Sequence, residues 1–257
     1  MDRVRDVPVP RANPRIRVHL AFADERVAVM NKMPGIVTEP GTSHRDDSLL
    51  NGLFAHEKGR FSQRLANLGE ARDWGLLHRL DRLTSGLVLA ALDAEAWDAL
   101  RADFEARRIA KTYLAIVRGD LPAACGEVDV PLLERVDRDY RVSVPDPRGK
   151  PALTRYRVLQ REGRYALVEC DLVTGRLHQI RVHLAILGAC VAGDPIYEAG
   201  GKAKPNAGKA KDPQLHLHAW RLAFRHPGTG EELSIAGEPP RRMSAFAEER
   251  GLSLPAT

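Results

Sequence analysis

The stretch from 76 to 92 constrains this chain more than any other, because a charged segment passes through a Thr-Ser-Gly break into an uninterrupted apolar run. The run from Leu87 to Leu92 is short, aliphatic and preceded by Gly86, which favours a buried strand over a helix. If the charged segment is extended as well, Arg79 and Asp81 share one face. Charges so close to a core strand indicate either a structural ion pair or an active site.

The composition is that of a globular protein with a sizeable core. Of the 257 residues, 44% are hydrophobic and 28% are charged, which fits one large domain or two lobes. No stretch is apolar for long enough to cross a membrane, and the first residues lack the hydrophobic segment of a signal peptide. We therefore expect a cytoplasmic protein with no membrane partner.

The charge balance favours an anionic partner. The formal net charge is +5, and nucleic acid is the obvious candidate for a basic chain. Cys125, Cys170 and Cys190 show no C-x-x-C spacing, so we predict neither a disulfide framework nor a metal site. We interpret all three as buried small residues in a reducing compartment.

Strands outnumber helices among the predicted elements. Short or alternating apolar runs predict strands over 26–32, 87–92, 111–118, 126–130, 154–160 and 164–173, with a closing hairpin over 215–226 and 231–235. Helical periodicity predicts helices over 48–56, 93–108, 174–188 and 241–250. Because no regular βαβ alternation is present, the fold class is α+β, with a large central mixed, mainly antiparallel β-sheet flanked by helices.

Two segments are predicted to lie outside the compact core. Residues 1–20 are expected to form a loose basic N-terminal arm, followed by a single domain over 21–250. Residues 200–212 are rich in Gly, Ala and Lys, which predicts a mobile basic loop within that domain.

A second cluster of charge lies at the start of the predicted helix over 174–188. Arg176 precedes the first turns, which carry His178, Arg181 and His183. A solvated basic helix end and an anion-binding site explain this pattern equally well. His178 and His183 are five residues apart, which separates them by about 140° on a helix, so a shared metal ion is a poor explanation.

Two further patches are ambiguous when taken alone. Lys111 and Tyr113 share a face at the start of a strand, where a half-buried tyrosine is usually a core residue but can also stack on a base. The turn from Gly193 to Tyr197 is equally compatible with a purely structural role.

Taken together, these motifs resemble the RluA-type pseudouridine synthases over nearly the whole chain. The resemblance is carried by residues 78–86, 111–113 and 174–183, and it is supported by 31–35, 193–197, 217–219 and 226–227. It implies a central sheet split into two lobes with an RNA-binding cleft between them, so that 21–250 is the catalytic domain. It also implies a monomer that isomerises selected uridines in ribosomal or transfer RNA without a metal or an organic cofactor.

The same resemblance implies roles for individual residues. Asp81 matches the catalytic carboxylate, acting as a nucleophile or as a base towards the ribose, and Arg176 matches the arginine that pairs with it. Tyr113 matches the residue that stacks on the target base and helps to remove the C5 proton. Arg79 is placed to fill the gap left by a flipped base. The remaining polar side chains of the motifs would contact RNA phosphates, namely His78, Arg82, Lys111, His178 and Arg181.

Some features depart from the family pattern, and two other functions compete with it. Met33 interrupts a frequent Lys-Pro pair, Leu177 stands where Thr is frequent, and too few residues precede the first strand for the small N-terminal RNA-binding module of many relatives. One alternative is a catalytically silent RNA-binding module on the same fold, which the intact Asp81, Tyr113 and Arg176 count against. The other is a glycosidase, which usually needs a second acid that the motifs do not offer beside Asp81.

Overall fold

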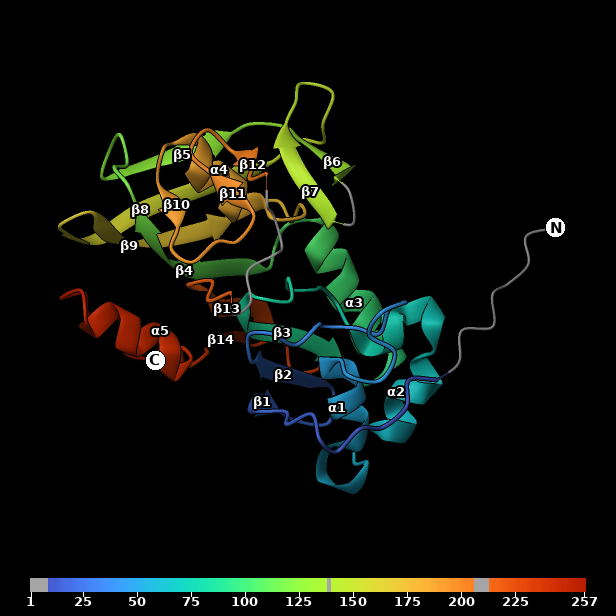
Figure 1. Cartoon of the computed structure of the whole chain (residues 1–257). Helices are drawn as coiled ribbons and strands as arrows, with labels where there is room; N and C mark the ends of the chain where they lie inside the picture. The colour runs from blue at the N-terminus through green and yellow to red at the C-terminus, as the bar shows by residue number, and fades with distance from the viewer. Residues whose placement is uncertain (1–8, 138–139, 206–212) are drawn as a thin grey trace.

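A computed structural model describes residues 9–137, 140–205 and 213–257 of the chain (Figure 1). Most of the predicted loop over 200–212 and the first eight residues of the predicted arm lie outside these ranges. In the described part, no helix is both long enough and apolar enough to span a membrane. The division into an arm and one domain over 21–250 stays a prediction.

Ten of the described strands form one mixed, mainly antiparallel sheet with the path β1-β2-β3-β13-β4-β9-β8-β5. β10 adds to β4 and β14 adds to β13. β3 and β13 pair in parallel, whereas the other described pairs of this sheet are antiparallel. The strands are β1 Leu20–Ala23, β2 Val27–Lys32, β3 Ser85–Ala91, β4 Ala110–Arg118, β5 Cys125–Asp129, β8 Leu153–Glu162, β9 Tyr165–Leu172, β10 Cys190–Val191, β13 Leu217–Arg225 and β14 Glu232–Ala236. The predicted α+β class is confirmed.

Helices pack on this sheet, and α1 and α3 begin at residues whose side chains cap them. Ser48 caps α1 and shares a capping box with Asn51, and the Asp93 carboxylate accepts the Ala96 N–H at the start of α3. α1 contributes leucines to one face of the sheet, while α3 packs Ala96 and Leu100 on the other. The helical elements are α1 Leu49–Ala55, η1 His56–Lys58, α2 Ser62–Leu68, η2 Glu70–Gly75, α3 Ala94–Glu105, α4 Gln179–Ile186 and α5 Arg241–Glu248.

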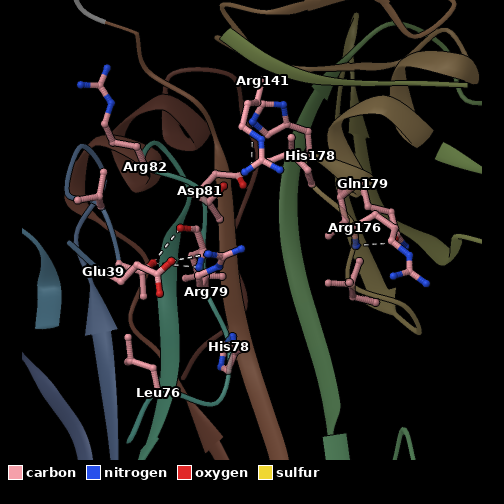
Figure 2. A pocket seen from close by; sticks show the side chains of 18 of the residues that line it. Glu39, Leu76, His78, Arg79, Asp81, Arg82, Arg141, Arg176, His178 and Gln179 are labelled. Carbon is pink, nitrogen blue, oxygen red and sulfur yellow. Dashed lines mark hydrogen bonds and ion pairs between the residues drawn. The ribbon is translucent and has the colours of Figure 1, made fainter. Parts of the chain in front are cut away.

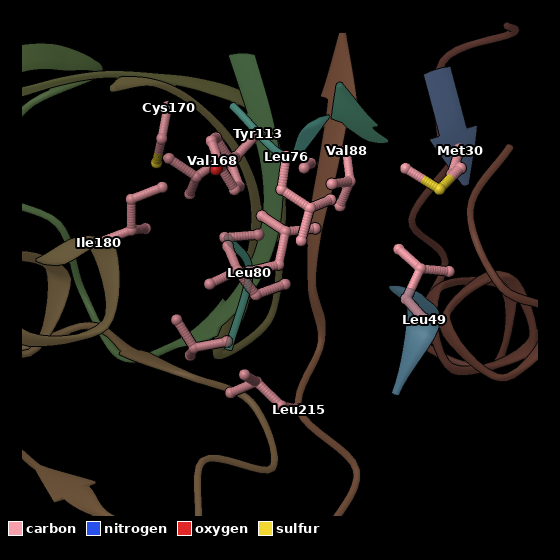
Figure 3. Close-up of a cluster of buried hydrophobic side chains, with 14 of the residues drawn as sticks. Met30, Leu49, Leu76, Leu80, Val88, Tyr113, Val168, Cys170, Ile180 and Leu215 are labelled. Carbon is pink, nitrogen blue, oxygen red and sulfur yellow. The ribbon is translucent and has the colours of Figure 1, made fainter. Parts of the chain in front are cut away.

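β3 is buried on both faces, which explains its uninterrupted apolar sequence. Leu87 and Leu89 point into the cluster under α3, whereas Val88 and Ala90 point into the cluster under α1, which Figure 3 shows. Each fully buried leucine or valine contributes about 1.5–3 kcal/mol to folding. β3 is therefore a fixed reference point for the segment that precedes it.

Several elements were not predicted from the sequence. The hairpin of β6 Leu132–Asp137 and β7 Tyr140–Pro145 stands apart from the central sheet in Figure 1. Val142 and Val144 of β7 alternate with Arg141 and Ser143, so a strand pattern is present there and was not recognised, whereas Leu132 and Leu133 of β6 are adjacent and do not alternate. α2 and the two-residue strands β11 Tyr197–Glu198 and β12 Lys202–Ala203 are too short to show a period.

Candidate active site

A cleft of about 780 Å³ opens between the segment before β3, the start of β4, the start of α4 and the β6–β7 hairpin (Figure 2). The residues that the sequence singled out meet here, although they come from distant parts of the chain. The cleft is lined by His78, Arg79, Asp81, Arg82, Lys111, Tyr113, Arg176, His178 and Arg181, together with Glu39, Glu134 and Arg141.

Asp81 lies in a tight turn that is anchored on both sides. The Thr84 N–H donates to the Asp81 carbonyl at 3.1 Å, and the side chain of Leu80 is buried in the core. The Thr38 hydroxyl donates to the Leu80 carbonyl at 2.8 Å and accepts the Leu80 N–H at 3.0 Å. Asp81 is thus held in place by its neighbours, while 24% of its own side chain stays exposed to the cleft.

Gly86 fixes the chain where this turn enters β3. Its φ is +115°, and a Cβ atom there would lie 2.3 Å from the Ala219 carbonyl oxygen, so the parallel pairing with β13 requires glycine. The side chains of Ser85 and His218 are buried beside Gly86, and the Ser85 hydroxyl lies 2.9 Å from Nδ1 of His218.

Lys32, which the sequence placed at the end of a strand, holds the Asp81 turn through hydrogen bonds of its ammonium group. Its side chain is fully buried, and Nζ donates to the carbonyls of Met33, Ile36 and Arg82 at 3.1, 2.8 and 3.2 Å. Burial lowers the pKa of Lys32 to about 7, while the nearby Asp81 charge favours the ammonium form. The three acceptors match the three ammonium protons, so this lysine ties the first strand to the turn.

Arg181 is the arginine beside Asp81. Its Nη1 lies 3.5 Å from Asp81 Oδ2, while Nε and Nη2 donate to the two Asp194 oxygens at 2.7 and 2.8 Å. The Arg181 side chain is only 2% exposed. This burial leaves the guanidinium no surface for the predicted phosphate contact.

The predicted pairing of Arg176 with Asp81 is wrong in this structure. α4 begins only at Gln179, and His178 before it has a left-handed backbone with φ of 55°. The chain therefore changes direction between the two arginines, and Arg176 Nε donates to the Pro151 carbonyl at 3.1 Å. Figure 2 shows its side chain pointing away from Asp81.

His178 faces the same Asp81 oxygen from the other side. Its Nε2 lies 3.8 Å from Asp81 Oδ2, and its Nδ1 lies 2.8 Å from the Tyr197 hydroxyl. Burial lowers the pKa of His178 to about 4, because the Asp81 charge only partly offsets the loss of solvent. The ring is therefore neutral at pH 7.

Tyr113 forms part of the apolar wall of the cleft. It is buried in β4, and burial together with the Asp81 charge raises its pKa well above the ordinary value. The phenol therefore keeps its proton at neutral pH.

Lys111 and His78 lie on the same side of the cleft, against Phe104. Burial lowers the pKa of Lys111, and its Nζ lies 5.4 Å from the centre of the Phe104 ring. His78 Nε2 accepts the Leu89 N–H at 3.1 Å, and burial lowers the pKa of His78 to about 3. A neutral His78 offers no charge to a phosphate.

Arg79 and Arg82 lie at the rim of the cleft. Arg79 forms an ion pair with Glu39 and is well exposed, while Arg82 is exposed directly beside Asp81. Both are placed where an incoming polyanion would meet them first.

Neither a cysteine nor a metal cluster contributes to this site within the described residues. No group of three or more potential metal ligands gathers in that part of the chain. His183 is buried, with its ring nitrogens bound to Thr154 and the Val130 carbonyl. The prediction that all three cysteines are buried is wrong for Cys125, which is exposed on the edge strand β5.

Comparisons with known proteins show which family the chain belongs to. The family model described as RNA pseudouridylate synthase matches residues 26–186. The chain is 37% identical over 244 residues to the ribosomal large subunit pseudouridine synthase D of Zymomonas mobilis, covering 93% of this chain and 75% of that one. It is 35% identical over 237 residues to the protein of the same name from Nitrosomonas europaea, covering 91% of this chain and 65% of that one.

A solved structure gives the same result. The chain aligns with Human RNA Pseudouridylate Synthase Domain Containing 4 at a TM-score of 0.64 and 26% identity, covering 92% of this chain and 94% of that one. The chain belongs to the RNA pseudouridylate synthase family.

Proposed function

We propose that this chain isomerises uridine to pseudouridine in RNA with Asp81 as the catalytic carboxylate, and that its substrate is large-subunit ribosomal RNA. The substrate is supported by the names of the relatives from Zymomonas mobilis and Nitrosomonas europaea. The reaction is supported above all by one observation: an incompletely hydrogen-bonded carboxylate beside a buried arginine, at the base of a cleft with basic residues at its rim.

The chemistry explains why these residue types are needed together. The C1′–N1 bond of uridine breaks, the uracil turns, C1′ bonds to C5, the C5 proton leaves and N1 gains a proton. Asp81 serves either as a nucleophile at C1′ or as a base towards the ribose, and both roles need an ionised carboxylate. Arg181 keeps that charge stable in a site from which RNA excludes water.

Binding of the target uridine requires it to leave its base stack. Tyr113 then offers the face of its ring to the uracil, and Arg79 fills the space left behind after its ion pair with Glu39 opens. Arg82 and Lys111 contact phosphates without reading the sequence.

The test is conversion of uridine in a transcript of large-subunit ribosomal RNA by the wild type and by Asp81→Asn. We expect the wild type to form pseudouridine without releasing uracil, and the variant to lose more than about 1,000-fold in turnover while its affinity for RNA stays within about threefold. Glu127→Gln, which removes an exposed pair with Arg155 on the edge strand β5, is the matched control and keeps full turnover.

Each contrary result overturns a different part of the proposal. Turnover of Asp81→Asn within about tenfold of the wild type removes Asp81 from the chemistry. Release of free uracil points to a glycosidase, and RNA binding without any product points to a silent RNA-binding module.

A further inference from the structure

Hydrogen bonds link the β6–β7 hairpin through Tyr197 to His178, whose ring faces Asp81. The Ser143 backbone N–H in β7 donates to the Tyr197 oxygen at 2.9 Å. That oxygen lies 2.8 Å from His178 Nδ1, and the other ring nitrogen, Nε2, faces Asp81 Oδ2 at 3.8 Å. Tyr197 is 1% exposed, so water does not compete for its hydroxyl.

The donors and acceptors along these hydrogen bonds determine which nitrogen of the His178 ring carries the hydrogen. Burial raises the pKa of Tyr197, so it is a phenol with one proton to donate. The Ser143 N–H occupies a lone pair on its oxygen, and among the described residues the acceptor within reach of the hydroxyl proton is His178 Nδ1. Nδ1 is then an acceptor, and the hydrogen of the neutral ring lies on Nε2.

The opposite tautomer conflicts with the surroundings of the ring. With hydrogen on Nδ1, both Ser143 and His178 would donate to Tyr197, whose own proton would have no acceptor among the described residues. Nε2 would then present a lone pair to the Asp81 carboxylate. Two acceptors facing each other in a partly buried site repel, so the geometry favours hydrogen on Nε2.

The contacts that His178 and Arg181 make with the Asp81 carboxylate both involve one of its two oxygens, Oδ2. The Nε2–H of His178 and the Nη1–H of Arg181 both approach Oδ2, at 3.8 and 3.5 Å. Both separations exceed hydrogen-bond length, and such contacts commonly shorten when a substrate closes the site. When both contacts shorten, two donors on one oxygen orient the carboxylate and leave Oδ1 for the substrate.

We propose that Tyr197 and His178 are positioning residues for Asp81, with the Tyr197 hydroxyl fixing His178 as the Nε2–H tautomer that holds Oδ2 and presents Oδ1 to the ribose. This proposal rests on the proposed function for the meaning of Oδ1. The tautomer itself does not depend on that function.

The first measurement is the imidazole nitrogen spectrum of the protein labelled with ¹⁵N-histidine, with the His178 signals identified by their loss in His178→Gln. We expect the wild type to show the Nε2–H pattern, and Tyr197→Phe to show a mixture of both tautomers. An Nδ1–H pattern or a charged ring in the wild type at pH 7 overturns the proposal. So does an unchanged Nε2–H pattern in Tyr197→Phe.

The second measurement is turnover on the ribosomal RNA transcript. For Tyr197→Phe we expect kcat to fall about tenfold while KM stays within about twofold, because Asp81 loses its orientation but RNA keeps its contacts. Tyr165→Phe, in β9 and packed on Phe246 of α5, is the matched control and keeps the wild-type kcat. An unchanged kcat in Tyr197→Phe contradicts the proposal.

A pair of substitutions at His178 separates positioning from a backbone role. Glutamine reproduces an N–H at the place of Nε2, whereas asparagine is too short but tolerates the left-handed φ of 55° better. We expect His178→Gln to keep about tenfold more kcat than His178→Asn. The reverse order shows that the residue serves only the backbone turn.

Failure of the proposed function gives a different result. A folded wild type that makes no pseudouridine on this transcript overturns the function there, while the imidazole spectrum still decides between the two tautomers.

Discussion

Arg181 lies between two carboxylates whose surroundings differ sharply. Asp194 is 2% exposed and receives four hydrogen bonds, two from Arg181 and two from the backbone N–H groups of Ile196 and Tyr197. Asp81 is 24% exposed, and the Arg181 guanidinium and the neutral His178 ring stay 3.5 and 3.8 Å from its Oδ2. One guanidinium thus meets a saturated carboxylate on one side and an unsaturated one on the other.

This difference fits the proposed roles of the two acids, which are structural for Asp194 and catalytic for Asp81. The lone pairs of a carboxylate that accepts several N–H donors are occupied and cannot attack carbon or remove a proton. Asp194 holds the Arg181 fork in place, and Nη1 of Arg181 then faces Asp81. Asp81 has a positive charge beside it and none of the four hydrogen bonds that Asp194 accepts.

Among the substitutions that test this comparison, Arg181→Lys should have the largest effect on turnover. A lysine keeps the positive charge but cannot bind both Asp194 oxygens and reach Asp81 at the same time. We expect kcat for pseudouridine formation to fall at least about 100-fold. Arg157→Lys, which changes an exposed pair with Glu169, is the control, and it should match the wild type. Near-normal turnover in Arg181→Lys would show that charge alone is sufficient.

Asp194→Asn should chiefly cost stability, and the cost should depend on pH. Burial alone would raise the pKa of Asp194, but Arg181 and the two N–H donors lower it below its ordinary value of 3.8. The ionised Asp194 therefore stabilises the fold above pH 3.8, and this contribution is lost as pH falls through the folded-state pKa.

Urea unfolding of this variant at pH 7 should give a loss of about 3–5 kcal/mol, because Arg181 loses a buried partner. The difference from the wild type should narrow below pH 3.8. Asp98→Asn, which removes an exposed pair with Arg72, serves as the control and should lose far less. If the loss of unfolding free energy in Asp194→Asn does not change with pH, the proposed pKa shift of Asp194 is contradicted.

Lys32→Met tests whether the Asp81 turn depends on the hydrogen bonds of the Lys32 ammonium group. The variant leaves three buried carbonyls without their donor, and we expect a loss of about 2–3 kcal/mol in the free energy of unfolding. Because Arg82 is one of the three, the turn should loosen and kcat should fall about tenfold. Stability and turnover are measured on the same preparation, and loss of stability without loss of turnover would limit Lys32 to folding.

The smallest effect is expected from Arg176→Ala. Arg176 binds the Pro151 carbonyl and lines the cleft without contacting Asp81, so kcat should stay within about threefold of the wild type. The apparent Kd for RNA should weaken by a similar factor, because one positive charge is lost at the cleft. A 100-fold loss of kcat would restore Arg176 as the partner of Asp81.

Local patterns predicted much of the fold. The buried strand over 87–92 and the helix capped by Asp93 both follow from short-range periodicity and capping, and both are present. The β6–β7 hairpin was missed although Val142 and Val144 alternate in β7, and its contacts include side chains that lie elsewhere in the sequence. One example is Tyr197, which accepts the Ser143 N–H.

The candidate site was predicted as a set of motifs but not as a set of contacts. Asp81, Tyr113, His178 and Arg181 do meet in one cleft. Which arginine faces Asp81 depends on a left-handed backbone at His178, and a non-glycine residue gives little local signal for that conformation. Lys32 and Asp194 were interpreted as strand and turn residues because their partners are backbone groups and a distant arginine.

The parallel pairing of β3 with β13 has a consequence for biosynthesis. Ser85 and His218 lie 133 residues apart in the chain, and they pair where β13 joins β3, the strand that follows Asp81. A ribosome adding about 5–20 residues per second needs roughly 7–27 s to translate that interval. During this time the nascent chain carries the Asp81 segment without the strand that fixes it. The enzyme therefore completes the strand that follows the Asp81 turn late in its own translation.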